Sequence, residues 1–210
     1  MDGGNISRAF IGDYLAALAS SSAAPGGGSS AALSGAMGAA LVSMVANLTL
    51  GREKYSAHQE LAEYTTMKAR ALMLELTDCV RKDMTAFDGV MAAFKLPKGT
   101  EERTIAVQEA YKVATSAPVE TAEKCLEVMK LAEGLLHKSN VTAACDLSAA
   151  ALEARAGILI ALENVGVNLA AIRDEEYVEE KRAWSADIDG ESRRLLDVIR
   201  AGVAEMTGGR

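Results

Sequence analysis

A charge-free stretch from Tyr14 to Gly51 constrains this chain more than any other feature. Such a run is either a membrane span, which needs about 20 predominantly apolar residues, or a helix surrounded by protein. Ala, Gly and Ser supply most of the run, and Ser43 and Asn47 would need polar partners in hydrocarbon. No basic cluster precedes it to set an orientation in a bilayer. These features favour a buried central helix and argue against a membrane partner.

The helix expected after the triple glycine carries small side chains, which let neighbouring backbones approach closely. They are Ala32, Gly35, Ala36, Ala39 and Ala40. Gly35 and Gly38 each cost roughly 1 kcal/mol of helix propensity relative to alanine. We expect a close-packed interface to offset that cost.

The composition predicts an all-α protein. Half of the 210 residues are hydrophobic, only 4% are aromatic, three are proline, and no alternating β-rich run occurs. The net charge of −7 argues against a general nucleic-acid surface. The cysteines Cys79, Cys125 and Cys145 are far apart and odd in number, which indicates free thiols in a reducing compartment. Because residues 1–8 also lack a basic start followed by an apolar core, we expect a cytoplasmic protein.

Apolar periodicity and breaker residues predict a single helical domain over residues 1–210. The expected helices cover about 7–20, a central helix after residue 28, then 57–95, 100–116, 118–138, 141–172 and 174–206. Ser7 is expected to cap the first of them. Pro118 is expected at a first helical position and Asn140 at an N-cap. Together these helices predict an all-α helical bundle with two long, nearly uncharged small-residue helices at its centre.

The lead-in to the central helix has two interpretations. Its residues are Pro25, Gly26, Gly27, Gly28 and Ser29. It is either a plain turn with Ser29 or Ser30 as the N-cap, or a helix start whose exposed N–H groups receive an anion or a polar ring.

A polar stripe follows on the same helix. It consists of Ser43, Asn47, Gly51 and Lys54, whose spacing places them on one face. Asn47, expected to be buried, either bonds a neighbouring backbone group or belongs to a polar groove that ends in the lysine.

Carboxylates in apolar surroundings are the candidate catalytic groups, because His58 and His137 fit no metal-ligand motif. Asp83 lies on the long helix, and Asp146 lies among alanines, where a carboxylate is costly unless it is paired, functional or near a helix start. Asn164 shares a helix face with Asp146, but the two are about 27 Å apart along the axis. One pocket of a single chain therefore does not easily use both, which leaves a dimer or a different role.

Five segments together resemble the formiminotransferase-cyclodeaminase / methenyltetrahydrofolate cyclohydrolase family. They read PGGGSSAA, GAMGAALVSMVANLTLGREKY, DMTAFDGVMAAFKLPK, SNVTAACDLSAAAL and ENVGVNLAAIRDEEY. The resemblance implies an all-helical fold, a homodimer and a tetrahydrofolate substrate bound without a metal or another cofactor. The positions that match the family's motifs are Pro25, Gly26, Gly27, Gly28, Ser29, Asn47, Lys54, Asp83, Asn140, Asp146 and Asn164.

Two features bear on which reaction the resemblance implies. The family's usual Gly-Asn and Ser-Asp-x-Gly become Ser139-Asn140 and Cys145-Asp146-Leu147-Ser148 here, which leaves a non-catalytic folate-binding protein as an alternative. The length has no room for a formiminotransferase domain. That favours hydrolysis of 5,10-methenyltetrahydrofolate to 10-formyltetrahydrofolate over a cyclodeaminase that releases ammonia.

The resemblance also suggests roles for individual residues. Asp146 and Asp83 are expected to handle protons, and Lys54 to orient substrate or water. The glycine loop and Asn47 would hold the pterin. The anionic glutamate tail needs a local basic patch in a negative protein, expected from Arg52, Lys54 and Lys98.

Overall fold

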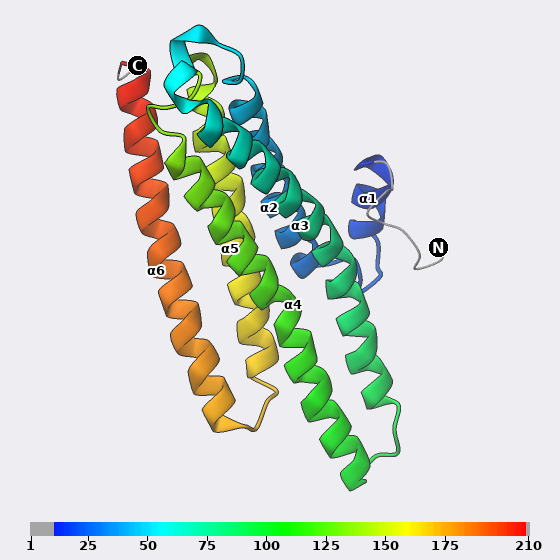
Figure 1. The fold of residues 1–210 in the computed structure, drawn as a ribbon. Coiled ribbons are helices and arrows are strands. Elements are labelled where there is room, and N and C mark those ends of the chain that lie inside the picture. Colours follow the sequence, from blue (N-terminus) through cyan, green and yellow to red (C-terminus); the bar gives the residue numbers. More distant parts are fainter. Residues whose placement is uncertain (1–10, 209–210) are drawn as a thin grey trace.

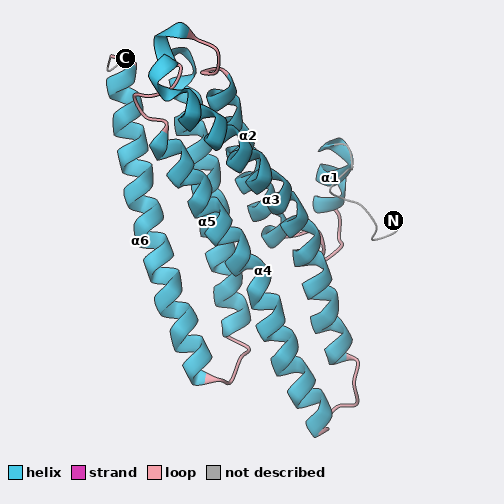
Figure 2. Cartoon of the chain, viewed as in Figure 1, coloured by secondary structure: helices cyan, strands magenta, loops and turns pink. Residues whose placement is uncertain are grey.

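A computed structural model describes residues 11–208, and every regular element in this range is helical (Figures 1 and 2). The α-helices are α1 (Ile11–Leu18), α2 (Gly27–Asn47), α3 (Gln59–Phe94), α4 (Glu101–Gly134), α5 (Ala144–Leu169) and α6 (Glu175–Met206). Short 3-10 helices precede α3 (η2, Glu53–His58) and α5 (η3, Val141–Ala143). The predicted all-α bundle is confirmed.

The four helices α2 to α5 form the core of the bundle. Helix α2 packs against α3, α4 and α5, while α6 covers α4 and α5 from the outside (Figure 1). Helix α1 contributes Tyr14, which is buried against Ala32 of α2 and against Cys79 and Val80 of α3. The hairpin of α3 and α4 extends beyond the connection between α5 and α6 (Figure 1).

Small residues bring α2 and α5 into backbone contact, as the sequence predicted. A Cβ atom added to Gly38 would lie 2.8 Å from the carbonyl oxygen of Ala150. One added to Gly157 would lie 2.7 Å from the carbonyl oxygen of Ala31. Neither helix could therefore carry alanine at these positions without moving away from the other.

Helix α2 is long and apolar enough to cross a membrane, but 61% of that stretch is buried inside the protein. Its buried residues include Ala31, Ala39 and Val42, each fully covered by neighbouring helices. The prediction of a helix enclosed by protein is confirmed over most of its circumference. The uncovered remainder runs along one outer face.

The predicted break at residues 116–118 is wrong. Helix α4 runs through this region without interruption, with Pro118 buried in its interior and Thr100 as its N-cap. Proline lacks an N–H, so the helical hydrogen bond to the carbonyl group of Ala114 is not made. Tertiary packing of the helix on both sides of the proline outweighs this local loss.

The predicted helix starts were partly right. Ser7 lies outside the described residues. Gly26, not a serine, is the N-cap of α2, and its N–H donates to the hydroxyl of Ser29 at 3.0 Å. Asn140 is a cap as predicted, since its side-chain oxygen accepts from the N–H of Thr142 at 3.1 Å. The chain makes a 3-10 turn there before α5 begins.

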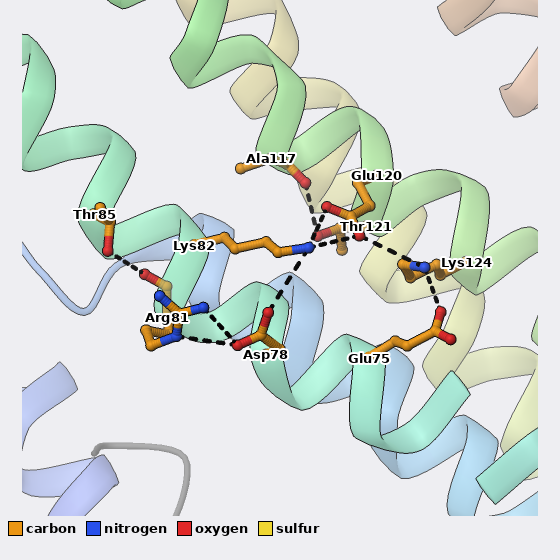
Figure 3. Close-up of polar contacts among 9 residues, drawn as sticks. All are labelled: Glu75, Asp78, Arg81, Lys82, Thr85, Ala117, Glu120, Thr121 and Lys124. Atoms are coloured by element: carbon orange, nitrogen blue, oxygen red, sulfur yellow. Dashed lines mark hydrogen bonds and ion pairs between the residues drawn. The ribbon is translucent and has the colours of Figure 1, made fainter. Parts of the chain in front are cut away.

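Ion pairs join the helices where the packing is polar. Lys82 of α3 bonds Glu120 of α4 at 2.8 Å, and Lys124 of α4 pairs with Glu75 of α3 (Figure 3). Arg155 of α5 is buried and bonds Ser192 at 2.9 Å and Asp189 at 2.6 Å, which fastens α6 to α5. The three cysteines are free, with Cys79 and Cys125 buried and Cys145 exposed.

Candidate active site

A cleft of about 370 Å³ lies where α2 begins. Helices α3 and α4 continue past the first residue of α2. Beyond that residue, α2 no longer covers their inner surfaces. The polar lining consists of Gly26, Gly27, Gly28, Asp83, Asn164 and Asn168, and the larger apolar lining residues are Phe87, Val90, Met91, Phe94, Tyr111 and Val167. The volume is within the range of small-molecule sites.

Asp83 lies directly against the start of α2. A Cβ atom added to Gly28 would overlap the Asp83 carboxylate, so any other residue at this position would displace that carboxylate. Burial raises the pKa of Asp83 above its usual range, and a hydrogen bond from the backbone N–H of Ser29 offsets part of the increase. The helix start thus holds a carboxyl group that gains a proton more readily than an exposed aspartate.

Asn164 lies beside Gly27 on the opposite wall. Its amide nitrogen donates to the carbonyl oxygen of Ile160 at 2.7 Å, which leaves the amide oxygen as an acceptor in the cleft. Asn168 follows one turn later on α5 and also lines the cleft. The cleft therefore offers amide groups and the N–H groups of a helix start near one carboxyl group.

The other half of the cleft is aromatic and apolar. Phe94 and Tyr111 meet edge to face, with ring centroids 6.2 Å apart. Phe87, Met91, Phe94 and Tyr111 were not among the site residues predicted from the sequence. A signal was available, because two of the three phenylalanines of this aromatic-poor chain lie between residues 87 and 94.

Asn47 and Asn140 lie at the other end of α2. The Asn47 amide donates to the carbonyl oxygen of Ser43 at 2.8 Å, which confirms the simpler interpretation, but its side chain is exposed, not buried as expected. Asn140 donates through its backbone N–H to the hydroxyl of Thr49 at 2.9 Å and through its amide to the carbonyl oxygen of Leu48 at 3.2 Å. Within one chain, Asn140 joins two connections of the bundle and does not reach the cleft.

The remaining predicted residues also lie outside the cleft of their own chain. Asp146 is half-buried in the first turn of α5, which begins at the end of the bundle away from Asn164. Lys54 is exposed in η2, with its ammonium 5.5 Å from the ring centroid of Tyr55. Lys98 is exposed in the α3–α4 connection. Pro25 is buried between the lining residues Ala24 and Gly26 but does not line the cleft itself. The structure thus brings together Gly26, Gly27, Gly28, Asp83 and Asn164, with Ser29 behind them.

Comparison with known proteins identifies the family. The family described as formiminotransferase-cyclodeaminase matches residues 10–186, which include both walls of the cleft. The chain belongs to the formiminotransferase-cyclodeaminase family. The resemblance of its motifs to that family is therefore confirmed.

Relatives within this family carry two activities in their names. A methenyltetrahydrofolate cyclohydrolase from Methylorubrum extorquens is 43% identical over 172 residues, which are 80% of this chain and 83% of the relative. A formimidoyltransferase-cyclodeaminase from Rattus norvegicus is 35% identical over 165 residues, 77% of this chain but only 30% of the rat protein. A formiminotetrahydrofolate cyclodeaminase from Thermotoga maritima superimposes with a TM-score of 0.83 at 28% identity, over 97% of this chain and 98% of that one. The fold and the enzyme family are shared over nearly the whole chain.

Proposed function

We propose that this protein hydrolyses 5,10-methenyltetrahydrofolate to 10-formyltetrahydrofolate. The observation that carries the proposal is the Asp83 carboxyl group, held at a glycine-rich helix start inside a cleft with an apolar far wall. The cyclohydrolase from Methylorubrum extorquens supports this choice, because this chain covers most of its length. The proposed reaction uses no metal and no other cofactor.

The chemistry needs a group that works in two protonation states. In the substrate, one carbon between N5 and N10 belongs to a delocalised cation. Water adds to that carbon, the bond to N5 breaks, and the carbon becomes the formyl group on N10. One water proton ends on N5 and the other is released. An ionised Asp83 stabilises the cation and accepts a proton from water, and its protonated form can deliver that proton to N5.

The groups around Asp83 suit a pterin ring. A pterin presents donors and acceptors along one edge and a flat apolar surface on each side. The N–H groups at the start of α2 and the amide oxygen of Asn164 can pair with such an edge. We assign pterin binding to Gly26, Gly27, Gly28 and Asn164, and proton transfer to Asp83.

The decisive experiment follows the methenyl absorbance of 5,10-methenyltetrahydrofolate with the purified protein. A parallel assay supplies 5-formiminotetrahydrofolate and measures ammonia, because the Thermotoga maritima relative is named a cyclodeaminase. Loss of absorbance without ammonia release supports the cyclohydrolase. Ammonia release would favour the cyclodeaminase, and folate binding with neither reaction would leave a non-catalytic binder. Asp83→Asn should lower turnover by about 100-fold or more.

We also propose that two copies of the chain pair through the outer face of α2. This face carries exposed Met37, Ala40, Met44 and Leu48 and no charged residue. An exposed apolar strip of this kind is typical of an interaction surface. In a two-fold contact the same face meets itself, with the two α2 helices antiparallel in the arrangement proposed here. The Asp146 end of one bundle then faces the Gly28 end of the other.

This pairing gives Asp146 and Lys54 a place at the partner's cleft, although both lie far from the cleft of their own chain. Asp146→Asn is then expected to lower turnover at least tenfold with the fold retained. Co-expression of Asp83→Asn with Asp146→Asn chains tests the arrangement directly. A mixed dimer contains one site with both natural carboxylates, so the mixture should recover about a quarter of the natural activity. No recovery would overturn a shared site.

We also propose a cytoplasmic location. It rests on the three free cysteines, which suit a reducing compartment.

A further inference from the structure

A cation lies at the aromatic end of the cleft. The guanidinium of Arg103, in the first turn of α4, lies 5.6 Å from the ring centroid of Phe94, and Phe94 in turn meets Tyr111. The backbone N–H of Arg103 donates to the hydroxyl of Thr100 at 3.3 Å, which fixes the turn from which the side chain extends. Arg103 thus lies against Phe94, which lines the cleft and itself meets the lining residue Tyr111.

The charge of Arg103 is not neutralised within the described part of the chain. No carboxylate of residues 11–208 lies within ion-pair distance of its guanidinium, whereas Lys112 of the same helix is paired with Asp174 at 2.8 Å. A half-buried guanidinium held against an aromatic ring and free of a carboxylate is suited to bind an external carboxylate in a two-pronged contact.

One end of the cleft carries the Asp83 carboxyl group, and the Arg103 guanidinium lies beside the other end. Asp83 and Phe94 both lie on α3 and are about 16 Å apart along its axis, from the rise per residue. A folate has the same polarity, with its reacting carbon near the pterin, a p-aminobenzoyl ring in the middle and glutamate carboxylates at the far end. With the reacting carbon at Asp83, the aromatic ring and the carboxylates extend toward Phe94.

We propose that Arg103 binds the glutamate carboxylate of the substrate, with Phe94 and Tyr111 as the wall against its p-aminobenzoyl ring. This inference rests on the proposed function, because it takes a tetrahydrofolate as the ligand. Neither Lys98 nor Arg103 lines the cleft itself, but Arg103 is half-buried against the lining residue Phe94, whereas Lys98 is exposed. The inference therefore changes the expected tail contact from Lys98 to Arg103.

Calorimetric titration tests the inference without requiring turnover. The ligands are 5-formyltetrahydrofolate and 5-formyltetrahydropteroate, which lacks the glutamate. Arg103→Gln should weaken binding of the first about tenfold, the usual size of one charge-assisted contact, and leave binding of the second unchanged. Arg173→Gln is the matched control, because Arg173 is an exposed cation in the α5–α6 connection outside the cleft.

Three outcomes would overturn the inference. The first is an unchanged Kd in Arg103→Gln, and the second is an equal loss of affinity for both ligands in that variant. The third is an equal loss of affinity in Arg173→Gln, which would indicate a general electrostatic effect. In the turnover assay, the same variant should raise KM for 5,10-methenyltetrahydrofolate with kcat nearly unchanged. A natural protein that binds with the expected contrast but turns nothing over would refute the proposed function and leave the tail contact standing.

Discussion

Gly28 and Asp83 form the contact on which the cleft depends. The missing side chain of the glycine lets a carboxyl group from α3 reach the first turn of α2, where backbone N–H groups are free to bond it. Burial and the helix start act in opposite directions on the pKa of that carboxyl group, and burial has the larger effect. The glycine at position 28 therefore leaves room for the Asp83 carboxyl group at a place where burial raises its pKa.

Gly28→Ala should abolish most of the activity while the bundle stays folded. The added Cβ would overlap the Asp83 carboxylate and displace it, and a displacement of about 1 Å can cost on the order of 100-fold in rate. The measurement is kcat/KM for 5,10-methenyltetrahydrofolate, with circular dichroism to confirm the fold. Gly89→Ala is the control, because no heavy atom lies within 4 Å of a Cβ there. Equal activity in the two variants would contradict the role of Gly28.

The raised pKa of Asp83 predicts a pH dependence of stability. Between the ordinary pKa of aspartate and the raised value, the folded protein binds more protons than the unfolded chain, so the free energy of unfolding falls as pH rises. Asp83→Asn removes this titration. In thermal melts from pH 4 to pH 8, the natural protein should lose stability relative to the variant as pH increases. A difference in stability between the two proteins that is constant over this pH range would show that burial does not raise the pKa of Asp83.

At the level of elements, α2 and α5 pack backbone against backbone, because glycines leave no side chain between them. Their backbones meet at Gly38 and Gly157, where a Cβ would lie under 3 Å from a carbonyl oxygen of the other helix. This contact fixes how far Gly27 lies from Asn164, and therefore the width of the cleft. The low helix propensity of glycine is offset by packing that no larger residue allows.

Gly157→Ala should destabilise the protein by about 1–3 kcal/mol, because overpacking forces the two helices apart. Gly190→Ala, in the exposed middle of α6 with nothing within 4 Å, should instead stabilise it by about 0.5–1 kcal/mol through helix propensity. Urea denaturation of both variants measures the difference. Stabilisation by both substitutions would mean that α2 and α5 can separate without cost.

At the level of the whole molecule, the cleft exists because the helices differ in length and position. Helices α3 and α4 continue past the start of α2, which uncovers their inner surfaces at one end of the bundle (Figure 1). The polar residues at the other end of α2 form a separate group around Asn140. Two copies of the bundle placed antiparallel on the outer face of α2 would join these groups.

Met44→Glu tests that assembly. Met44 is 38% exposed on the uncharged outer face of α2, and a carboxylate there would meet its own copy or apolar surface across the two-fold contact. Light scattering after size exclusion should show a dimer for the natural protein and a monomer for the variant. Met67→Glu introduces the same change on α3, at a residue that is 61% exposed, and should remain a dimer. A monomeric natural protein would refute the proposed pairing.

The sequence by itself determined the helical class, the buried small-residue helix and the family. These follow from local patterns, since charge-free runs, glycine spacing and motifs are properties of consecutive residues. Residues such as Asp83 and the glycine loop were also identified in this way. The unbroken course of α4 through Pro118 was missed, because packing at a distance outweighs the local preference of proline.

Only the tertiary structure decided which candidates share a cleft. It placed Asp83 and Asn164 at the start of α2, and Asn47 and Asn140 at its other end. It also placed Arg103 against Phe94. Helix lengths and crossings determine such distances between residues far apart in the chain, and no pattern along the sequence encodes them directly.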